Sequence, residues 1–211
     1  MANQDVSSPP ASARKPSRPI SRKSGDERWE ELLDVSARMF AQHGYAATSL
    51  QQIADELGIL KGSIYYYIKS KGDLLYEVIR SVYWDGFERF QRYSQEAGTG
   101  LELLARAIEG HAVFLVEHLT ATTVYLHEFE RLEPAQREQL TEYDYRQLVS
   151  DLIRRGQADG SVRGDVDPAI AALAVLGAVN WIYRWYRPGL RTPEEIGGEF
   201  AKIFVSGLAA D

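Results

Sequence analysis

The sequence predicts an all-α protein of about nine helices. Apolar residues recur at spacings of three and four along most of the 211-residue chain, no segment alternates apolar and polar residues as a strand would, and turn signals are widely spaced. A hydrophobic content of 45% is enough to build a substantial core. The chain has no cysteine, which excludes disulfides, thiol nucleophiles and thiolate metal sites.

Residues 1–25 differ in composition from everything that follows. They are rich in Ser, Pro and Arg, and they hold five basic residues against one acidic residue, although the whole chain has a net charge of −6. With so few large apolar groups they are expected to form a disordered basic arm. Two interpretations stay open: an inert solubilising tail, and an arm that adds phosphate contacts to a nucleic-acid site.

Two helices are predicted after the arm. The first carries an apolar stripe at helical spacing and ends near Gly44. The second begins at Thr48 or Ser49, and Gln51 stands three residues after Thr48, as a capping box requires. Gly58 ends this helix, because a residue without Cβ can take the positive φ of a helix C-terminus.

A third, shorter helix is predicted from Lys61 to Ile68. Ile64 and Ile68 can dock on the second helix, while Gly62 lets the backbone approach a ligand closely. The opposite face is polar and aromatic, and lysines extend it: Lys61, Ser63, Tyr66, Tyr67, Lys69 and Lys71. Three consecutive tyrosines are often half-buried core residues, but neighbours on a helix point about 100° apart and cannot all face inward. Two short helices joined at a glycine, the second rich in donors, predict a helix-turn-helix that binds DNA.

The segment 41–79, AQHGYAATSLQQIADELGILKGSIYYYIKSKGDLLYEVI, resembles the TetR/AcrR family of transcriptional repressors. The family patterns F-x-x-x-G-Y/F-x-x-T-S/T-[VIM]-x-x-IA and GVSKGTLYYHFKSKEELL both align without a gap. The resemblance implies that bases or flanking phosphates are approached by Gln51, Ser63 and Tyr65. It implies that the phosphate backbone is held by Thr48, Tyr66, Tyr67 and Lys71, with Lys61 able to do either.

The predicted DNA-binding segment departs from the family in two residues and has an unexpected charge. Leu60 replaces a small hydroxyl N-cap, which removes a cap worth about 1 kcal/mol, and Tyr67 replaces a histidine. Residues 26–71 hold five basic residues against seven acidic ones. Affinity for DNA is therefore expected to depend on the positions of a few side chains, and on dimerisation or the basic arm, more than on bulk attraction.

The remaining chain predicts a second helical domain over residues 73–211, after a DNA-binding head over residues 26–72. A fourth helix leaves the head and runs to a break at residues 98–100. Further helices are expected at 101–119, 120–132, 134–158, 168–186 and from 193 onward. The last two begin with an Asp or Thr cap followed by proline at the first helical position.

Residues 168–179, PAIAALAVLGAV, are apolar on every side of the predicted eighth helix. Such a helix must be covered all round, either as a central core helix or with one side against a partner subunit. The family resemblance favours a partner, since its members look like homodimers joined by a four-helix bundle of their last two helices. A two-fold dimer also suits a palindromic operator.

The segment that follows, residues 180–188, is a candidate ligand site. Its amphipathic aromatic residues and arginines suit a large ligand with apolar and anionic parts, although they also suit a helix end anchored by aromatics. The segment resembles TetR-type regulators of fatty-acid, sterol and aromatic-acid degradation, several of which respond to acyl-coenzyme A thioesters. On that resemblance Arg184 or Arg187 meets the phosphates. The other candidate ligand residues are Phe114, Leu115, Tyr125, Phe129, Asn180 and Trp181. A regulator of drug efflux that senses a neutral lipophilic compound is the alternative.

Motifs for catalysis are missing from the sequence. No HExxH, GxSxG or phosphate-loop pattern is present, so we expect a protein that is not an enzyme and has no cofactor. One metal site stays open, if folding brings together His111, Glu117 and His127. A scaffold with a vestigial DNA-binding head is a third class of function. The longest apolar run is shorter than the roughly 20 residues that span a bilayer, which predicts a cytoplasmic protein with no membrane segment.

Overall fold

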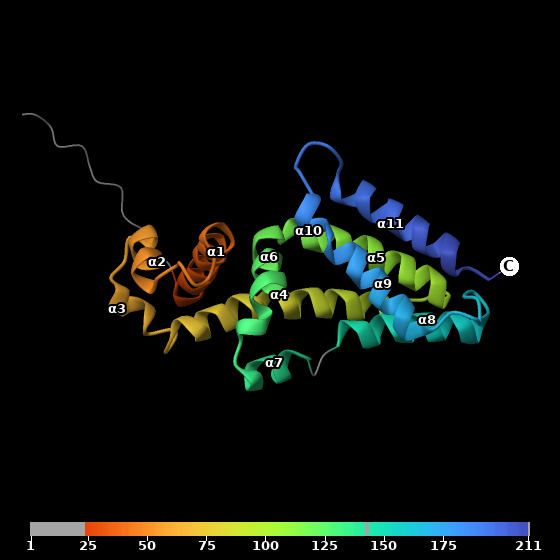
Figure 1. The fold of residues 1–211 in the computed structure, drawn as a ribbon, viewed down its shortest axis with the longest axis horizontal. Helices are drawn as coiled ribbons and strands as arrows, with labels where there is room; N and C mark the ends of the chain where they lie inside the picture. Colours follow the sequence, from red (N-terminus) through yellow and green to blue (C-terminus); the bar gives the residue numbers. More distant parts are fainter. Residues whose placement is uncertain (1–23, 142–143, 211) are drawn as a thin grey trace, which may run out of the picture.

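The computed structural model describes residues 24–141 and 144–210, and in these residues the chain is helical almost throughout (Figure 1). The prediction of an all-α fold is confirmed. Three helices form a head at one end of the molecule: α1 (Gly25–His43), α2 (Leu50–Leu57) and α3 (Lys61–Ile64). The predicted basic arm lies outside the described residues, except for its last two positions.

The ends of the head helices follow from local sequence. Ser24 caps α1 and exchanges hydrogen bonds with Glu27, while Ser49 caps α2 and exchanges them with Gln52. The capping pair is thus Ser49 and Gln52, one residue later than the predicted pair of Thr48 and Gln51. Gly58 ends α2 with a φ of 65°, as its lack of a side chain predicted.

A long helix, α4 (Lys71–Ser94), runs from the head into a larger helical domain (Figure 1). The domain contains α5 (Gly100–Glu117), α6 (Leu119–Glu128), the 3-10 helix η1 (Phe129–Arg131), α7 (Pro134–Thr141), α8 (Tyr145–Asp159), α9 (Pro168–Asn180), α10 (Ile182–Trp185) and α11 (Pro193–Leu208). Helix α6 packs against both α1 and α4. It therefore joins the domain to the head through a second contact besides α4.

Two of the predicted helices are each divided in the structure, which gives eleven α-helices in the described residues where about nine were expected. The segment 134–158 is divided into α7 and α8, because the Asp144 side chain accepts from the Arg146 N–H and caps a new helix. The segment 168–186 is divided at Trp181. There the Arg184 N–H bonds to the Trp181 carbonyl, three residues back, and the regular α-helix is interrupted.

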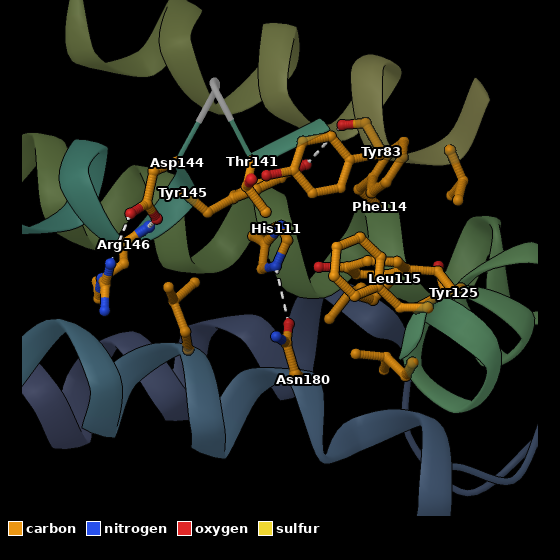
Figure 2. A pocket seen from close by; sticks show the side chains of 15 residues that line it. Tyr83, His111, Phe114, Leu115, Tyr125, Thr141, Asp144, Tyr145, Arg146 and Asn180 are labelled. Atoms are coloured by element: carbon orange, nitrogen blue, oxygen red, sulfur yellow. Dashed lines mark hydrogen bonds and ion pairs between the residues drawn. The ribbon is translucent and has the colours of Figure 1, made fainter. Parts of the chain in front are cut away.

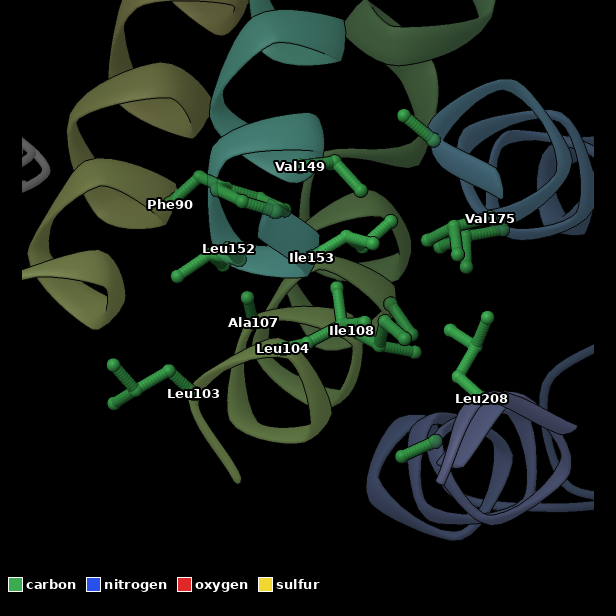
Figure 3. Close-up of a cluster of buried hydrophobic side chains, with 14 of the residues drawn as sticks. Phe90, Leu103, Leu104, Ala107, Ile108, Val149, Leu152, Ile153, Val175 and Leu208 are labelled. Carbon is green, nitrogen blue, oxygen red and sulfur yellow. The ribbon is translucent and has the colours of Figure 1, made fainter. Parts of the chain in front are cut away.

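Helix α5 forms the centre of the larger domain. One face of it is fully buried, including Leu104 and Ile108, and α4, α8, α9 and α11 all pack against it (Figure 3). The contact between α5 and α8 is close because glycines meet there: a Cβ added to Gly100 would lie 2.1 Å from the Gly156 backbone nitrogen. This packed centre supports the walls of the cavity described below.

Candidate functional site

The predicted DNA-binding tyrosines lie on the outer surface of the head. Tyr66 is 89% exposed, and the rings of Tyr65 and Tyr67 are partly exposed. Tyr67 stacks on Trp29 of α1, with ring centroids 5.7 Å apart. The three tyrosines therefore do not share one environment: Tyr66 contacts little of its own protein, whereas Tyr67 is partly committed to packing.

The remaining surface around α3 is formed by four other predicted residues. Lys61 and Gly62 are exposed, Ser63 is half-buried, and a Cβ added to Gly62 would meet nothing within 4 Å. Gln51 on α2 is exposed too, with its amide donating to the Asp55 carboxylate at 2.8 Å. The α-helical part of α3 ends at Ile64, four residues before the predicted end, because the following residues continue as a turn.

Thr48 and Lys71, both predicted to bind phosphates, contact backbone carbonyls of the head in this structure. Thr48 is only 2% exposed, and its hydroxyl donates to the Gly44 carbonyl at 2.9 Å, so this side chain is part of the head's interior. The Lys71 ammonium donates to the carbonyls of Tyr45 and Thr48 at 2.9 and 2.8 Å. In this structure Lys71 therefore fastens the loop between α1 and α2 to the start of α4.

A cavity of about 220 Å³ lies inside the larger domain (Figure 2). Its wall includes five of the eight predicted ligand residues, Phe114, Leu115, Tyr125, Phe129 and Asn180. The sequence reasoning did not select the other ten lining residues, which are Val82, Tyr83, His111, Thr122, Leu126, Thr141, Asp144, Tyr145, Arg146 and Leu176. These come from helices distant in sequence, so no local motif could have identified them as a group.

The cavity has a buried inner wall and an exposed edge. His111, Phe114 and Thr122 on the inner wall are buried, whereas Thr141 and Arg146 at the edge are exposed. An aromatic cluster completes the wall, since the rings of Tyr83, Phe87 and Phe90 all pack against Tyr145. A ligand would enter past Arg146 and meet mostly aromatic and aliphatic surface.

Most polar groups of the cavity wall are paired with one another. The Nε2 atom of His111 lies 3.2 Å from the Asn180 amide oxygen, and the Tyr145 hydroxyl donates to the Tyr83 carbonyl at 3.1 Å (Figure 2). Arg146 donates to the Asp144 carboxylate at 2.9 Å. The single guanidinium of the lining set is therefore neutralised by a neighbouring carboxylate until a ligand competes for it.

Burial keeps the ionisable groups of the inner wall uncharged near neutral pH. It lowers the pKa of His111 to about 4, although the hydrogen bond to Asn180 acts in the other direction. It also raises the pKa of Tyr125 to about 12, and the pKa values of Tyr83 and Tyr145 above their usual range. The neutral His111 ring thus carries its proton on Nε2 when the amide oxygen is the acceptor.

The other three predicted ligand residues do not line this cavity, and their part in ligand binding stays a prediction. Trp181 is exposed at the end of α9, and Arg184 and Arg187 are exposed beyond it. The Arg187 guanidinium donates to the adjacent Tyr186 carbonyl. Arg146 on α8 is the cation that reaches the cavity.

The histidine cluster considered from the sequence does not assemble. His111 contacts Asn180, His127 contacts the Tyr183 hydroxyl, and Glu117 pairs with Arg89. Over residues 24–141 and 144–210, no three His, Asp or Glu side chains come close enough to hold a metal ion. Across the same residues, no helix is both long and apolar enough to cross a membrane.

Helix α9 leaves an apolar stripe in solvent. Ala172, Val175 and Val179 on its inner face are buried, while its outer face exposes Ile170, Leu173, Ala174, Gly177 and, just past its end, Trp181. Ile203 on α11 is exposed as well. Contiguous apolar surface of this kind marks an interaction site more often than a plain protein surface does.

Family models match both parts of the chain. Residues 32–78 match the model of bacterial regulatory proteins of the tetR family, and residues 97–208 match the tetracyclin repressor-like C-terminal domain. The first match contains α2 and α3, and the second contains most of the cavity wall. The two matches thus divide the molecule as the head and the larger domain do.

Individual proteins resemble the chain over most of its length. The HTH-type transcriptional repressor KstR2 of Rhodococcus jostii is 33% identical over 204 residues, which are 92% of this chain and 97% of the relative. The structure of the ketosteroid transcriptional regulator KstR2 of Mycobacterium tuberculosis has a TM-score of 0.82 and 27% identity, covering 89% of this chain and 98% of that one. AibR in complex with isovaleryl coenzyme A and operator DNA has a TM-score of 0.75 and 26% identity, covering 84% and 97%.

Proposed function

The chain belongs to the tetR family of bacterial regulatory proteins and is a ligand-responsive transcriptional regulator. We propose that an acyl-coenzyme A thioester binds in the cavity and releases the protein from operator DNA. In this proposal residues 26–72 bind DNA, and residues 73–211 bind the effector and form the dimer. The protein represses by occupying its operator, acts by binding and not by catalysis, and works in the cytoplasm where the operator is.

The DNA-binding role rests on the exposed surface of the head. Gln51 on α2, Lys61 and Gly62 on α3, and Tyr65 and Tyr66 just after α3 are all exposed, and the most exposed of these tyrosines is Tyr66. Ser63 is half-buried beside them, and Tyr67 stacks on Trp29. The proposal includes both as DNA-binding residues. Few of these groups are charged, so a single head supplies little bulk attraction to DNA.

Regulators of this family bind operator DNA as dimers, and the exposed stripe of α9 supplies a surface for that contact. Burying Leu173, Gly177 and Trp181 against the same residues of a second copy would remove apolar area from water and place two heads on one side of the dimer. A Leu173→Glu variant is expected to be monomeric in sedimentation and to bind operator far more weakly. Full-affinity binding by a monomer would contradict the dimer.

The observation that carries the effector proposal is an apolar, aromatic cavity with one guanidinium at its edge. The acyl group would occupy the aromatic interior, and the anionic coenzyme A part would stay near Arg146. Among the described residues Arg146 pairs with Asp144, and it is exposed, so it can exchange that partner for a phosphate without a new buried charge. The solved complex of AibR with isovaleryl coenzyme A and operator DNA supports this ligand class.

A continuous set of contacts joins the cavity to the head. Tyr125 and Phe129 line the cavity, and between them Glu128 accepts a long hydrogen bond of 3.4 Å from the Tyr45 N–H in the loop between α1 and α2. The same loop is held on its other side by Lys71. A ligand that displaces the end of α6 would therefore disturb the loop that positions α2, which is how occupancy of the cavity lowers operator affinity in this proposal.

The test is operator binding in the presence of defined thioesters. Operator fragments selected by the protein from random DNA are titrated with and without isovaleryl-, octanoyl- and benzoyl-coenzyme A, with coenzyme A and each free acid as controls. We expect one thioester to weaken operator binding at least tenfold. A free acid that acts as strongly as its thioester would contradict the proposal, and release by neutral lipophilic compounds alone would favour a regulator of drug efflux.

A matched pair of variants locates the anionic part of the ligand. Arg146→Gln removes the cation at the cavity edge, and Arg154→Gln removes an equally exposed arginine of α8 that pairs with Asp151 at 2.8 Å. We expect only Arg146→Gln to lower thioester affinity, by several-fold, because a charge-assisted contact is lost. Equal effects of both variants would mean that general charge, and not this site, attracts the ligand.

A further inference from the structure

Tyr125 of α6 offers the cavity a hydroxyl group that no other described residue binds. Its ring packs edge-on against those of Tyr83 and Phe129, with centroids 5.5 and 5.6 Å away, which fixes the orientation of the side chain. Figure 2 shows that this side chain extends from α6 into the space between the lining residues, toward His111. Its hydroxyl has no hydrogen-bond partner among the described residues, and it is not one of the unpartnered polar atoms that the protein buries completely. A ligand atom in the cavity can therefore meet it.

Two other hydroxyl groups of the cavity wall are already bonded within the protein. The Tyr145 hydroxyl donates to the Tyr83 carbonyl at 3.1 Å, and the Thr141 hydroxyl donates to the Arg137 carbonyl at 3.0 Å. Neither can donate to a ligand without losing the bond that it makes. The Tyr125 hydroxyl loses no such bond, so a ligand that brings an acceptor adds a hydrogen bond there.

The Tyr125 hydroxyl lies between the buried inner wall of the cavity and its charged edge. His111, toward which the Tyr125 ring points, belongs to the inner wall, whereas Asp144 and Arg146 stand together at the edge. Burial, and to a smaller extent the Asp144 carboxylate, raises the pKa of Tyr125 to about 12, so the hydroxyl keeps its proton near neutral pH. A donor in this place suits the neutral carbonyl that joins the apolar acyl group of a thioester to its anionic part.

We propose that the Tyr125 hydroxyl donates a hydrogen bond to the thioester carbonyl oxygen of the effector. This inference rests on the proposed function, because it describes a contact of the same ligand in the same cavity. The acyl chain then lies on the side of His111, and the coenzyme A part leaves past Arg146. Tyr125 is a specificity-determining residue that favours a thioester over a thioether of the same carbon skeleton, because the thioether brings no acceptor and leaves the hydroxyl unpaired.

The experiment compares thioesters with the matching thioethers, which lack only the carbonyl oxygen, binding to the full-length protein by calorimetry. The pairs are isovaleryl- and S-isopentyl-, octanoyl- and S-octyl-, and benzoyl- and S-benzyl-coenzyme A. Tyr125→Phe keeps the ring and removes the hydroxyl. Tyr76→Phe is the control, because the Tyr76 hydroxyl donates to Gln139 at 2.9 Å and Tyr76 does not line the cavity.

We expect the wild type to bind at least one thioester about 3- to 10-fold more tightly than its thioether, the range of one neutral hydrogen bond. Tyr125→Phe should lose this preference by binding the thioester more weakly, with its affinity for the thioether unchanged. Tyr76→Phe should keep the preference. Thermal unfolding and operator binding without ligand, measured on the same proteins, establish that each variant is folded.

Three results would overturn the inference alone. Equal affinity of the wild type for each thioester and its thioether, or an unchanged preference in Tyr125→Phe, would mean that Tyr125 does not bind the carbonyl. A loss of affinity for both kinds of probe in Tyr125→Phe would mean that the substitution acts through the shape of the cavity. A wild type that binds operator DNA but none of the thioesters would contradict the proposed effector class as well, which distinguishes that failure from one at Tyr125.

Discussion

Tyr66 in the head leaves 89% of its surface in solvent, and Thr122 in the larger domain leaves 1%. In the proposed function the first binds DNA outside the protein, and it contacts little of its own chain. The second lines a wall built from helices that are far apart in sequence. The head is thus a small scaffold that displays side chains, whereas the larger domain is a packed shell around a space. Substitutions in the two regions should consequently fail in different ways.

The largest difference between the regions concerns a buried histidine: the larger domain contains His111, and the described residues of the head contain none. Because its pKa is lowered to about 4, the folded protein takes up its proton later than the unfolded chain does as pH falls. Its contribution to the free energy of unfolding is complete above pH 6.5 and is lost between pH 6.5 and 4, by on the order of 2 kcal/mol by pH 5. Denaturant unfolding at fixed protein concentration should show this loss in wild type but not in His111→Gln. If the free energies of unfolding of wild type and His111→Gln changed in parallel with pH, His111 would be in contact with water.

Two glycines allow the same substitution to be made in both regions. A Cβ on Gly86 of α4 would lie 2.3 Å from the Tyr145 hydroxyl and 2.7 Å from the Phe114 ring, whereas Gly62 of the head faces open space. Gly86→Ala should cost about 1–3 kcal/mol of stability and weaken effector binding, since it forces the cavity wall to move. Gly62→Ala should leave stability within about 0.5 kcal/mol and weaken operator binding, because in the proposed function the added methyl group faces the DNA. The opposite pattern would reverse the assignment of the two regions.

The tyrosines of the head provide a comparison within one surface. Tyr66→Ala should lower operator affinity about tenfold, or roughly 1.4 kcal/mol, and leave the melting temperature unchanged. Tyr67→Ala should in addition lose the stack on Trp29 and about 0.5–1.5 kcal/mol of stability. Fluorescence anisotropy with operator DNA and thermal unfolding distinguish the two. Normal DNA binding by Tyr66→Ala would remove Tyr66 from the proposed DNA-binding surface, whereas a wild type that selects no operator from random DNA would favour a scaffold with a vestigial head.

The smallest expected effect lies at the contact between the regions. Glu128→Ala removes the acceptor for the Tyr45 N–H, so it should reduce the effector's influence on operator affinity by about 2- to 5-fold, within the range for residues that carry coupling. Glu130→Ala is the control, because Glu130 pairs with Arg137 at the surface nearby. Operator titrations with and without effector measure the ratio. If Glu128→Ala left the ratio of operator affinities without and with effector unchanged, the contact between Glu128 and Tyr45 would not couple the cavity to the head.

The same comparison explains what could be predicted from the sequence. In the head, the cap at Ser49 and the glycine at Gly58 act on residues a few positions away. One short segment of the sequence is therefore enough to predict the helix-turn-helix. The burial of Thr48 is a tertiary effect, since its hydroxyl bonds to the end of α1. A local sequence pattern therefore does not predict it. The composition of α9 left open whether it is a central core helix or one that meets a partner, and the family resemblance, not the composition, favoured the partner.

The cavity could be predicted only in part. Aromatic residues on the fifth and sixth helices were good candidates because large apolar groups line most ligand sites. His111 was missed as a wall residue since its partner Asn180 is 69 positions away in sequence. Arg184 and Arg187 lie beyond Trp181, where α9 ends, and both are exposed outside the cavity wall. Arg146 has no sequence signal that distinguishes it from other surface arginines.

The central claim is that the exposed surface of the head and the buried cavity are coupled, and thermodynamic reciprocity tests it most directly. The dissociation constant of the thioester that releases the operator is measured by calorimetry on the free protein and on the protein saturated with operator DNA. If the effector weakens operator binding tenfold, the DNA-bound protein must bind the effector tenfold more weakly. Equal effector affinity in the two states would contradict the coupling and with it the proposed regulation.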